Sequence, residues 1–371
     1  MKRIVILIIT MLLLTTNVLA SNEEIYNEQY EKSGAADLYE SLPPSAQEFL
    51  NKIKAEDMQG ASEDISANNV FYGIMDILKN GFKRPFASLC TIICLIILSS
   101  FLNGIASENS TATRAISYVT TLGVITATIL PIVSVIKLSV SAIKGCSVFM
   151  LSFVPVFGGI LISKGNAAVS AGFTGIMLAV SELISSAAGF LILPMVGIYL
   201  AFSICSAVSE GINITGIGEL FKKTATWIMT FAMSIFLSVM SIQTIIGSSA
   251  DSVAMKTAKF VVSSAVPVVG ASIGEAISSV KACATVLSSS VGMFGVICVV
   301  ACLLPVLIEL FLWRISLLAC KSVSDMFSLF QVSNILRAVD IAISFLIAII
   351  LCIFILFVVS TTMVTLLGGK V

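Results

Sequence analysis

Histidine is absent from the 371-residue chain, and charged residues make up only 11% of it, against 57% hydrophobic residues. Without histidine, a Ser–His–Asp triad, a Cys–His pair and a histidine-ligated zinc or haem are excluded. A soluble domain has about a quarter of its residues charged. The chain has too few polar side chains to cover a water-soluble globule, so its composition predicts an all-α polytopic membrane protein in contact with a lipid bilayer.

Nucleotide and nucleic-acid binding also lack a basis in the sequence. No glycine-rich loop ends in Gly-Lys-Ser/Thr, so the chain has no nucleotide site of the usual ATPase type. The 21 basic and 21 acidic residues cancel, and net charge therefore gives no argument for nucleic acid as a partner. No cofactor is predicted, and an intramembrane enzyme has no constellation of catalytic residues behind it.

None of the nine cysteines lies between residues 21 and 85, which excludes a disulfide-stapled secreted module. Cys90 and Cys94, and likewise Cys298 and Cys302, are four residues apart and would share a helix face. Such pairs suit a soft metal. Cysteine used as a small apolar residue explains them more simply, and no metal site is predicted.

The first twenty residues have the pattern of a secretory signal peptide. A basic start is followed by an apolar run over 4–14, with Thr10 as its one polar residue, and by Val-Leu-Ala at 18–20. The alternative interpretation is a first transmembrane helix, but the run is shorter than the length needed to span a bilayer. We therefore predict cleavage between Ala20 and Ser21, and an extracytoplasmic location for residues 21–85.

The extracytoplasmic segment is acidic and small. Between residues 21 and 66, eleven acidic residues stand against three basic ones. The sequence Pro-Pro-Ser-Ala-Gln-Glu at 43–48 predicts a helix start with a capping box, and an apolar face over 49–53. A second amphipathic stretch at 70–78 predicts a helix in the membrane interface, although the same face would suit a docked partner.

Apolar stretches of about 20 residues, the length of a span, follow one another along the rest of the chain. The stretch 165–209 is about 45 residues long, twice the hydrocarbon thickness at 1.5 Å per residue, and should cross twice. About seven to nine transmembrane or re-entrant helices are predicted in total. The other stretches are 86–105, 115–136, 145–163, 225–249, 260–280, 282–308 and 341–363.

The two halves of the apolar part match at an offset near 112. The sequence at 154–158 (Val-Pro-Val-Phe-Gly) matches 266–270 (Val-Pro-Val-Val-Gly), and three weaker matches occur in the same order. We therefore predict two tandem units, with one span before them and one helix with a short tail after them. Their bounds are 86–110 for the first span, 111–223 and 224–336 for the units, and 337–371 for the last helix and tail.

Each unit carries a Pro-x-x-Gly sequence that would break a membrane helix, and a matching second proline about 39 residues later. A proline leaves a backbone carbonyl unpaired, which lipid cannot satisfy, so paired breaks favour a transporter-like or pore-like centre. The alternative is kinks that only serve packing. Whether the units are parallel or inverted stays open. The candidate pore positions are Pro155, Gly158, Gly159 and Pro194 in the first unit, and Pro267, Gly270, Gly274 and Pro305 in the second.

Charges within the apolar part are candidates for function because they are costly at membrane depth. Glu182 would be a buried site or a hydrated connector between two helices. Glu309 and Arg314 would pair inside the bundle, or lie on an interfacial helix with Trp313 at headgroup level. Glu275 follows the small-residue pair Gly270/Gly274 and would flank a helix–helix contact.

The run Ser-Gly-Ala-Ala-Asp-Leu-Tyr-Glu-Ser-Leu-Pro at 33–43, together with the repeated Val-Pro-Val, resembles the stage III sporulation protein AE family of endospore-forming bacteria. The run departs from the family at Ala36, where an acidic residue often stands. The resemblance covers essentially the whole chain.

This resemblance implies a non-catalytic membrane subunit of a channel-like complex between mother cell and forespore, located in the mother-cell membrane around the forespore. It also implies other membrane subunits and an external ATPase as partners, and a requirement in late forespore development. The alternative is a secondary transporter with a substrate or ion site at the paired broken helices.

Overall fold

The computed structural model describes residues 30, 33–53, 67–105, 111–208, 215–265 and 270–367. Within these ranges the chain is helical throughout its regular structure, and no strand occurs. The all-α fold class predicted from composition is confirmed. The signal peptide, its cleavage site at Ala20/Ser21, and Pro267 lie outside the described residues.

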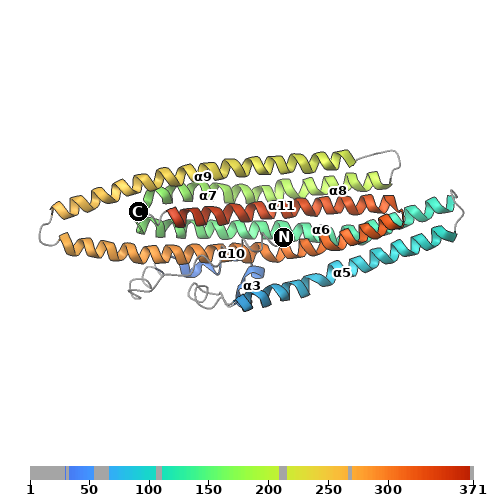
Figure 1. Cartoon of the computed structure of the whole chain (residues 1–371), viewed down its shortest axis with the longest axis horizontal. Helices are drawn as coiled ribbons and strands as arrows, with labels where there is room; N and C mark the ends of the chain where they lie inside the picture. Colours follow the sequence, from blue (N-terminus) through green and yellow to red (C-terminus); the bar gives the residue numbers. More distant parts are fainter. Residues whose placement is uncertain are drawn as a thin grey trace.

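Seven α-helices and a short π-helical turn form the main body of the described part. They run side by side as an elongated bundle (Figure 1). The elements are α5 (Ala67–Ile105), α6 (Thr111–Ser163), α7 (Ala167–Ala187), η2 (Ala188–Ile192), α8 (Leu193–Val208), α9 (Thr215–Ala265), α10 (Gly270–Met326) and α11 (Phe330–Leu367).

Several of these helices are far longer than a membrane is thick. The 57 residues of α10 and the 53 residues of α6 correspond to about 85 and 80 Å at 1.5 Å per residue, against a hydrocarbon core of about 30 Å. Among the described residues, six helices are long and apolar enough to cross a membrane. The chain is therefore a multi-pass membrane protein whose bundle is longer than one bilayer core.

The division into separate spans was wrong at three places. The stretch 260–280 is not one span, because α9 ends at Ala265 and α10 begins at Gly270 and continues through 282–308. The stretches 115–136 and 145–163 lie on the single helix α6, which continues through the two lysines between them. The stretch 165–209 does not turn back after Glu182: α7, η2 and α8 follow one another along the bundle (Figure 1). Charged side chains on the exposed side of a helix interrupt a hydropathy plot without interrupting the backbone hydrogen bonds.

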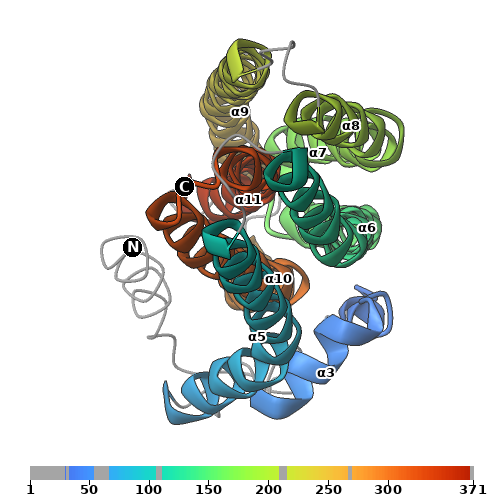
Figure 2. The same ribbon diagram turned by 90° about the vertical axis from the view of Figure 1, so that its right-hand side faces the viewer.

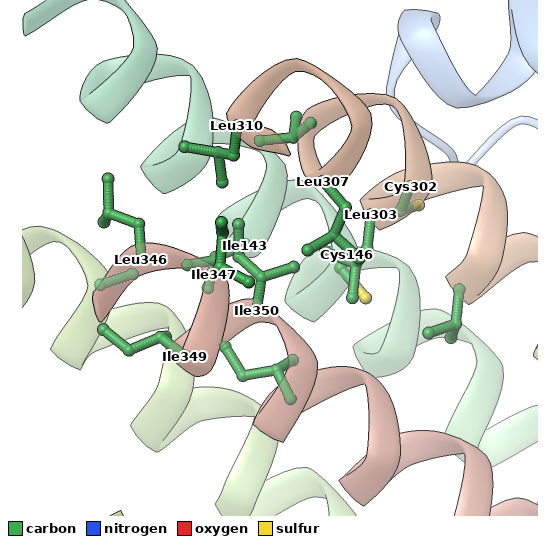
Figure 3. Close-up of a cluster of buried hydrophobic side chains, with 14 of the residues drawn as sticks. Ile143, Cys146, Cys302, Leu303, Leu307, Leu310, Leu346, Ile347, Ile349 and Ile350 are labelled. Carbon is green, nitrogen blue, oxygen red and sulfur yellow. The ribbon is translucent and has the colours of Figure 1, made fainter. Parts of the chain in front are cut away.

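Helix α11 lies inside the bundle, with α6, α8, α9 and α10 around it (Figure 2). Its contacts with α10 are the most extensive between any two of the described elements. Figure 3 shows the contact region, where isoleucines and leucines of α11 meet side chains of α10 and α6. The labelled residues are Ile143, Cys146, Cys302, Leu303, Leu307, Leu310, Leu346, Ile347, Ile349 and Ile350.

Helices α6 and α10 are each followed by a residue whose φ lies in the left-handed region. After α6, Gly165 has φ 92°, and the amides of Gly165 and Asn166 donate to the carbonyls of Ile162 and Leu161. After α10, Ser328 has φ 56°, with the same pair of backward hydrogen bonds. Both are Schellman motifs, and each reverses the chain within a few residues.

Residues 33–53, which we call the N-terminal clasp, pack on the outside of the bundle against α5, α6 and α10. The clasp contains the short 3₁₀-helix η1 (Ala35–Leu38) and helix α3 (Pro44–Ile53). The predicted helix and its apolar face are confirmed, since Phe49, Leu50 and Ile53 are buried. The capping box is not formed as predicted. Instead, Gln47 Nε2 donates to the carbonyls of Tyr39 and Leu42 ahead of the helix.

The predicted interfacial stretch 70–78 is helical, but it is not a separate element. It is the first half of α5 and continues directly into the first apolar span. Phe71 and Tyr72 are exposed there, whereas Gly73 is buried against the clasp.

Candidate functional site

The predicted helix breaks do not occur at three of the four prolines. α6 is continuous through Pro155, and α10 is continuous through Pro305. Pro194 follows the π-helical turn η2, so the chain there is distorted but still helical. Pro155 and Pro194 are exposed, and Pro305 is partly buried. These three positions do not converge on a broken-helix centre.

The glycines after Pro155 have different surroundings. Gly159 is exposed with nothing near it, whereas Gly158 is buried against α7. Ser170 Oγ donates to the Gly158 carbonyl at 2.7 Å, and a Cβ on Gly158 would collide with the Thr174 hydroxyl. Gly158 therefore serves close packing of two helices, which is a frequent use of glycine in membrane bundles. Gly270 and Gly274 lie in the first turns of α10.

A buried carboxylate joins α9 to the beginning of α7. Asp251 is only 5% exposed, and its two oxygens accept from the amides of Ala168 at 2.8 Å and Val169 at 3.0 Å. These amides belong to the first turn of α7, where no partner exists within the helix itself. The Asp251 carboxylate thus caps α7 from a neighbouring helix, and it also favours the positive end of the helix dipole.

Two glycines allow the close approach that this cap requires. A Cβ on Gly247 would lie 2.9 Å from the Val169 amide nitrogen and 3.0 Å from its Cα. A Cβ on Gly172 would overlap the side chain of Gln243. Since both contacts are made within two turns of Asp251, the α7–α9 seam is a backbone-to-backbone contact held by one charge-assisted cap.

A stack of phenylalanines fills the centre of the bundle. Phe149, Phe153 and Phe157 follow one another along α6 with ring centroids 5.7 and 5.4 Å apart, and Phe173 of α7 meets Phe157 edge-on at 5.5 Å. All four are at most 1% exposed. The α10 positions facing them are Gly292 and Gly295, where a Cβ would collide with these rings or with Thr365.

The intramembrane charges pair differently from the prediction. Arg314 of α10 does not pair with Glu309. Its Nε lies 3.2 Å from Oδ1 of Asp340 on α11, and the two side chains are 37% and 19% exposed. Trp313 is 1% exposed, so its ring is covered by the neighbouring helices and does not face headgroups as predicted. The pair therefore joins α10 to α11 at the edge of the core.

The three predicted glutamates are not brought together. Glu309 is half-buried on α10, near the guanidinium of Arg84 on α5. Glu182 lies within α7 and is exposed, so it is neither a buried site nor a residue of a connector. Glu275 lies in the first turns of α10.

The interpretation of the cysteines as small apolar residues fits one of the two pairs. Cys298 and Cys302 are fully buried, and Cys302 lies beside Cys146 of α6 (Figure 3). Cys90 and Cys94 are exposed on α5. The described part of the chain holds no group of three or more cysteine, aspartate or glutamate side chains placed to bind a metal ion.

Sequence reasoning missed Asp251 and Asp340, two carboxylates of the apolar part that have defined partners. Asp251 ends the uncharged stretch 225–250, and this position could have marked it as a candidate charge within the apolar part. Its partner, however, is the backbone of α7, and no side-chain pattern reveals a backbone partner. Asp340 sits directly before the apolar stretch 341–363, and no feature of the sequence singled it out.

The geometry defines a class of protein: a polytopic helical membrane bundle held by glycine-mediated packing and a few buried polar contacts. The family model for stage III sporulation protein AE matches residues 49–368. The chain belongs to the stage III sporulation protein AE family, and its role is in sporulation.

Stage III sporulation protein AE of Bacillus subtilis (strain 168) is 26% identical over 281 residues, which is 75% of this chain and 68% of the relative. No solved structure matches. The predicted family is thus confirmed by a match that covers the apolar part and begins after the run at 33–43.

Proposed function

We propose that this protein is a non-enzymatic membrane subunit of a channel- or secretion-like complex between mother cell and forespore, needed for late forespore development. It would act by assembly with other membrane subunits in the mother-cell membrane around the forespore. An external ATPase would supply energy for any active transport, because the sequence has no phosphate-binding loop of its own. Family membership supports the sporulation role.

The observation that carries the proposal is the filled centre of the bundle. Phe149, Phe153, Phe157, Phe294 and Trp313 occupy the interior, and each is at most 2% exposed. Large apolar side chains packed to this extent leave no wet path along the axis of the described part. A conduit that involves this chain would therefore be built between subunits, and not through one copy of it.

A long apolar stripe on α9 supports lateral assembly. The exposed residues recur every three or four positions along one side of the helix, over about 30 Å. Such a stripe needs a cover of lipid or protein. Its members are Trp227, Ile228, Phe231, Ile235, Val239, Ile242, Ile245 and Ile246.

The transporter alternative has lost its main support. It depended on paired broken helices, but Pro155 and Pro305 lie inside continuous helices and Pro194 follows a π-helical turn that leaves the chain helical. Glu182, its best candidate for a substrate or ion ligand, is exposed on α7. The tandem units 111–223 and 224–336 remain a prediction of the sequence.

The test is purification of tagged full-length protein from sporulating cells. We expect other stage III membrane subunits to co-purify with the wild type, and much less with Ile242→Glu, which puts a charge in the α9 stripe. Thr257→Glu is the matched control, since Thr257 is exposed on the same helix beyond the stripe. Equal recovery of subunits with Ile242→Glu, or recovery of the wild type with no other subunit, would contradict assembly through this surface.

A further inference from the structure

The N-terminal clasp covers an apolar part of α6 that the sequence assigns to lipid. Pro43 of the clasp packs closely on Gly145 of α6, since a Cβ added to Gly145 would lie 3.0 Å from the proline ring. Gly34 of the clasp lies near Val156 of α6. On α5, a Cβ at Gly73 would lie 3.0 Å from Ile53. The clasp therefore spans three turns of α6, within the stretch 145–163 that was expected to cross the membrane.

The clasp itself is amphipathic, with its charges turned away from the bundle. Its apolar side is almost fully buried and supplies the contacts to α5, α6 and α10. On its outer side Asp37, Glu40, Glu48 and Lys52 are all exposed. Four exposed charges within sixteen residues are incompatible with the hydrocarbon core, so this face of the bundle meets water.

An ion pair confirms the polar character of the clasped level. Lys52 Nζ lies 2.6 Å from Asp76 on α5 and 2.8 Å from Glu48. These three side chains are 37–70% exposed. The first half of α5 is therefore at the same aqueous level as α3.

The boundary of this aqueous level is marked by basic residues on two helices. Lys83 and Arg84 are exposed on α5, directly before its uncharged stretch 86–105, and Lys137 is exposed on α6, directly after the uncharged stretch 115–136. The stacked rings of Phe82 and Phe86, with centroids 5.2 Å apart, are exposed beside them. Basic and aromatic side chains together are typical of the headgroup region.

The register of α5 against α6 places these residues at one level. The two helices are antiparallel, and a Cβ on Gly123 would lie 3.4 Å from Leu95. Counting from that contact at 1.5 Å per residue, Arg84 lies about 16 Å along α5 and Lys137 about 21 Å along α6, in the same direction. The two differ by about one helical turn, well within the reach of their side chains.

We infer that, on this face of the bundle, the membrane–water interface lies at Lys83, Arg84 and Lys137, where their cations meet the phosphate headgroups of the bilayer. The α5–α6 hairpin is embedded beyond that level. α6 after Lys137 stands in the aqueous layer with the clasp, which covers it in place of lipid. This assignment does not depend on the proposed function.

Cysteine labelling in the full-length protein tests this inference. On a background without the nine native cysteines, Glu48→Cys, Lys144→Cys and Thr126→Cys would be treated with a charged, membrane-impermeant maleimide in intact cells and in inverted vesicles. Lys144 and Thr126 are both exposed on α6, so they differ in level and not in burial. We expect Lys144→Cys to label from the same side as Glu48→Cys, and Thr126→Cys to label less than one tenth as much until detergent is added.

Protection of Lys144→Cys equal to that of Thr126→Cys, or labelling from the side opposite to Glu48→Cys, would overturn the inference. A disulfide between Pro43→Cys and Gly145→Cys, formed with an added oxidant, checks that the clasp is seated. The control is Pro43→Cys with Gly159→Cys, because nothing lies near Gly159. Failure of the first pair to cross-link would overturn the inference as well.

Discussion

Removal of the Asp251 carboxylate is the substitution that best tests how the bundle is held together. In Asp251→Ala, the amides of Ala168 and Val169 lose their acceptor while Val169 stays buried and Ala168 half-buried. A hydrogen bond to a charged group contributes about 1.5–3 kcal/mol, and an unsatisfied buried donor costs about 1–3 kcal/mol. These two hydrogen bonds are the helix cap, and we expect their loss to destabilise the bundle by about 3–5 kcal/mol.

Thermal unfolding of the detergent-solubilised protein, followed by circular dichroism at 222 nm, measures the effect. For a bundle of this size the expected loss corresponds to a fall in apparent Tm of about 5 °C or more. Asp251→Asn keeps one carbonyl oxygen as an acceptor but loses the charge, so it should fall between the wild type and Asp251→Ala.

Glu182→Ala is the control for a general effect of removing an acidic residue. Glu182 is exposed on α7, and its removal should change the Tm by less than about 1 °C. If Asp251→Ala were as stable as Glu182→Ala, the cross-helix cap would contribute nothing, and the α7–α9 seam would be held by glycine packing alone.

The glycine seam, the Arg314–Asp340 pair and the clasp give three further predictions. Gly247→Ala should destabilise the bundle by about 1–3 kcal/mol because the added methyl meets the backbone of Val169, whereas Gly175→Ala, with nothing within 4 Å, should be neutral or slightly stabilising; thermal unfolding of the two variants in parallel checks this. For Arg314→Gln and Asp340→Asn, a double-mutant cycle should give a coupling of about 1 kcal/mol, since the pair is partly exposed and screened; additive single effects would show that the pair contributes nothing. Hydrogen bonds from Lys52 to Asp76 and Glu48 raise the pKa of Lys52 above its ordinary 10.5. Its contribution is therefore complete below pH 10.5 and is lost as the pH rises through the higher, folded-state value. The difference between wild type and Lys52→Met in proteolysis of the clasp should vanish in that alkaline range, and a difference that persisted there would contradict the ion pair.

The fold class was predictable because composition alone decides it. With 11% charged residues, the chain has to bury its surface in lipid or in other protein, and helices are the simplest way to satisfy the backbone there. The clasp helix at 44–53 was also predictable, since a turn signal precedes an apolar face at helical spacing. Both inferences use local or summed properties of the sequence.

The division of α6 was not predictable for a physical reason. Lys137 follows the uncharged stretch 115–136 and Lys144 precedes the stretch 145–163, so a hydropathy criterion places a loop between them. Both side chains extend from the exposed side of the helix, so the backbone hydrogen bonds continue beneath them. Pro155 misled in the same way: it was expected to break the helix, and the helix runs on through it with Pro155 exposed.

The partners of Asp251 and Asp340 depend on long-range packing. Asp251 is 83 residues from Ala168, and only the antiparallel arrangement of α7 and α9 brings the carboxylate to the start of α7. Arg314 has an acidic residue five positions away in sequence, yet it pairs with Asp340 across a helix hairpin. The sequence alone does not give the register between helices, so it cannot show which of these charged residues pair.

The most direct test of the central claim is a transport assay with the purified full-length protein alone in liposomes, run beside the complex isolated from sporulating cells. Because the centre of the bundle is filled and the chain is proposed to work only by assembly, the account predicts no solute flux above that of empty liposomes from the protein alone. Saturable uptake by the protein alone, abolished by Glu182→Gln or Pro155→Ala, would contradict it.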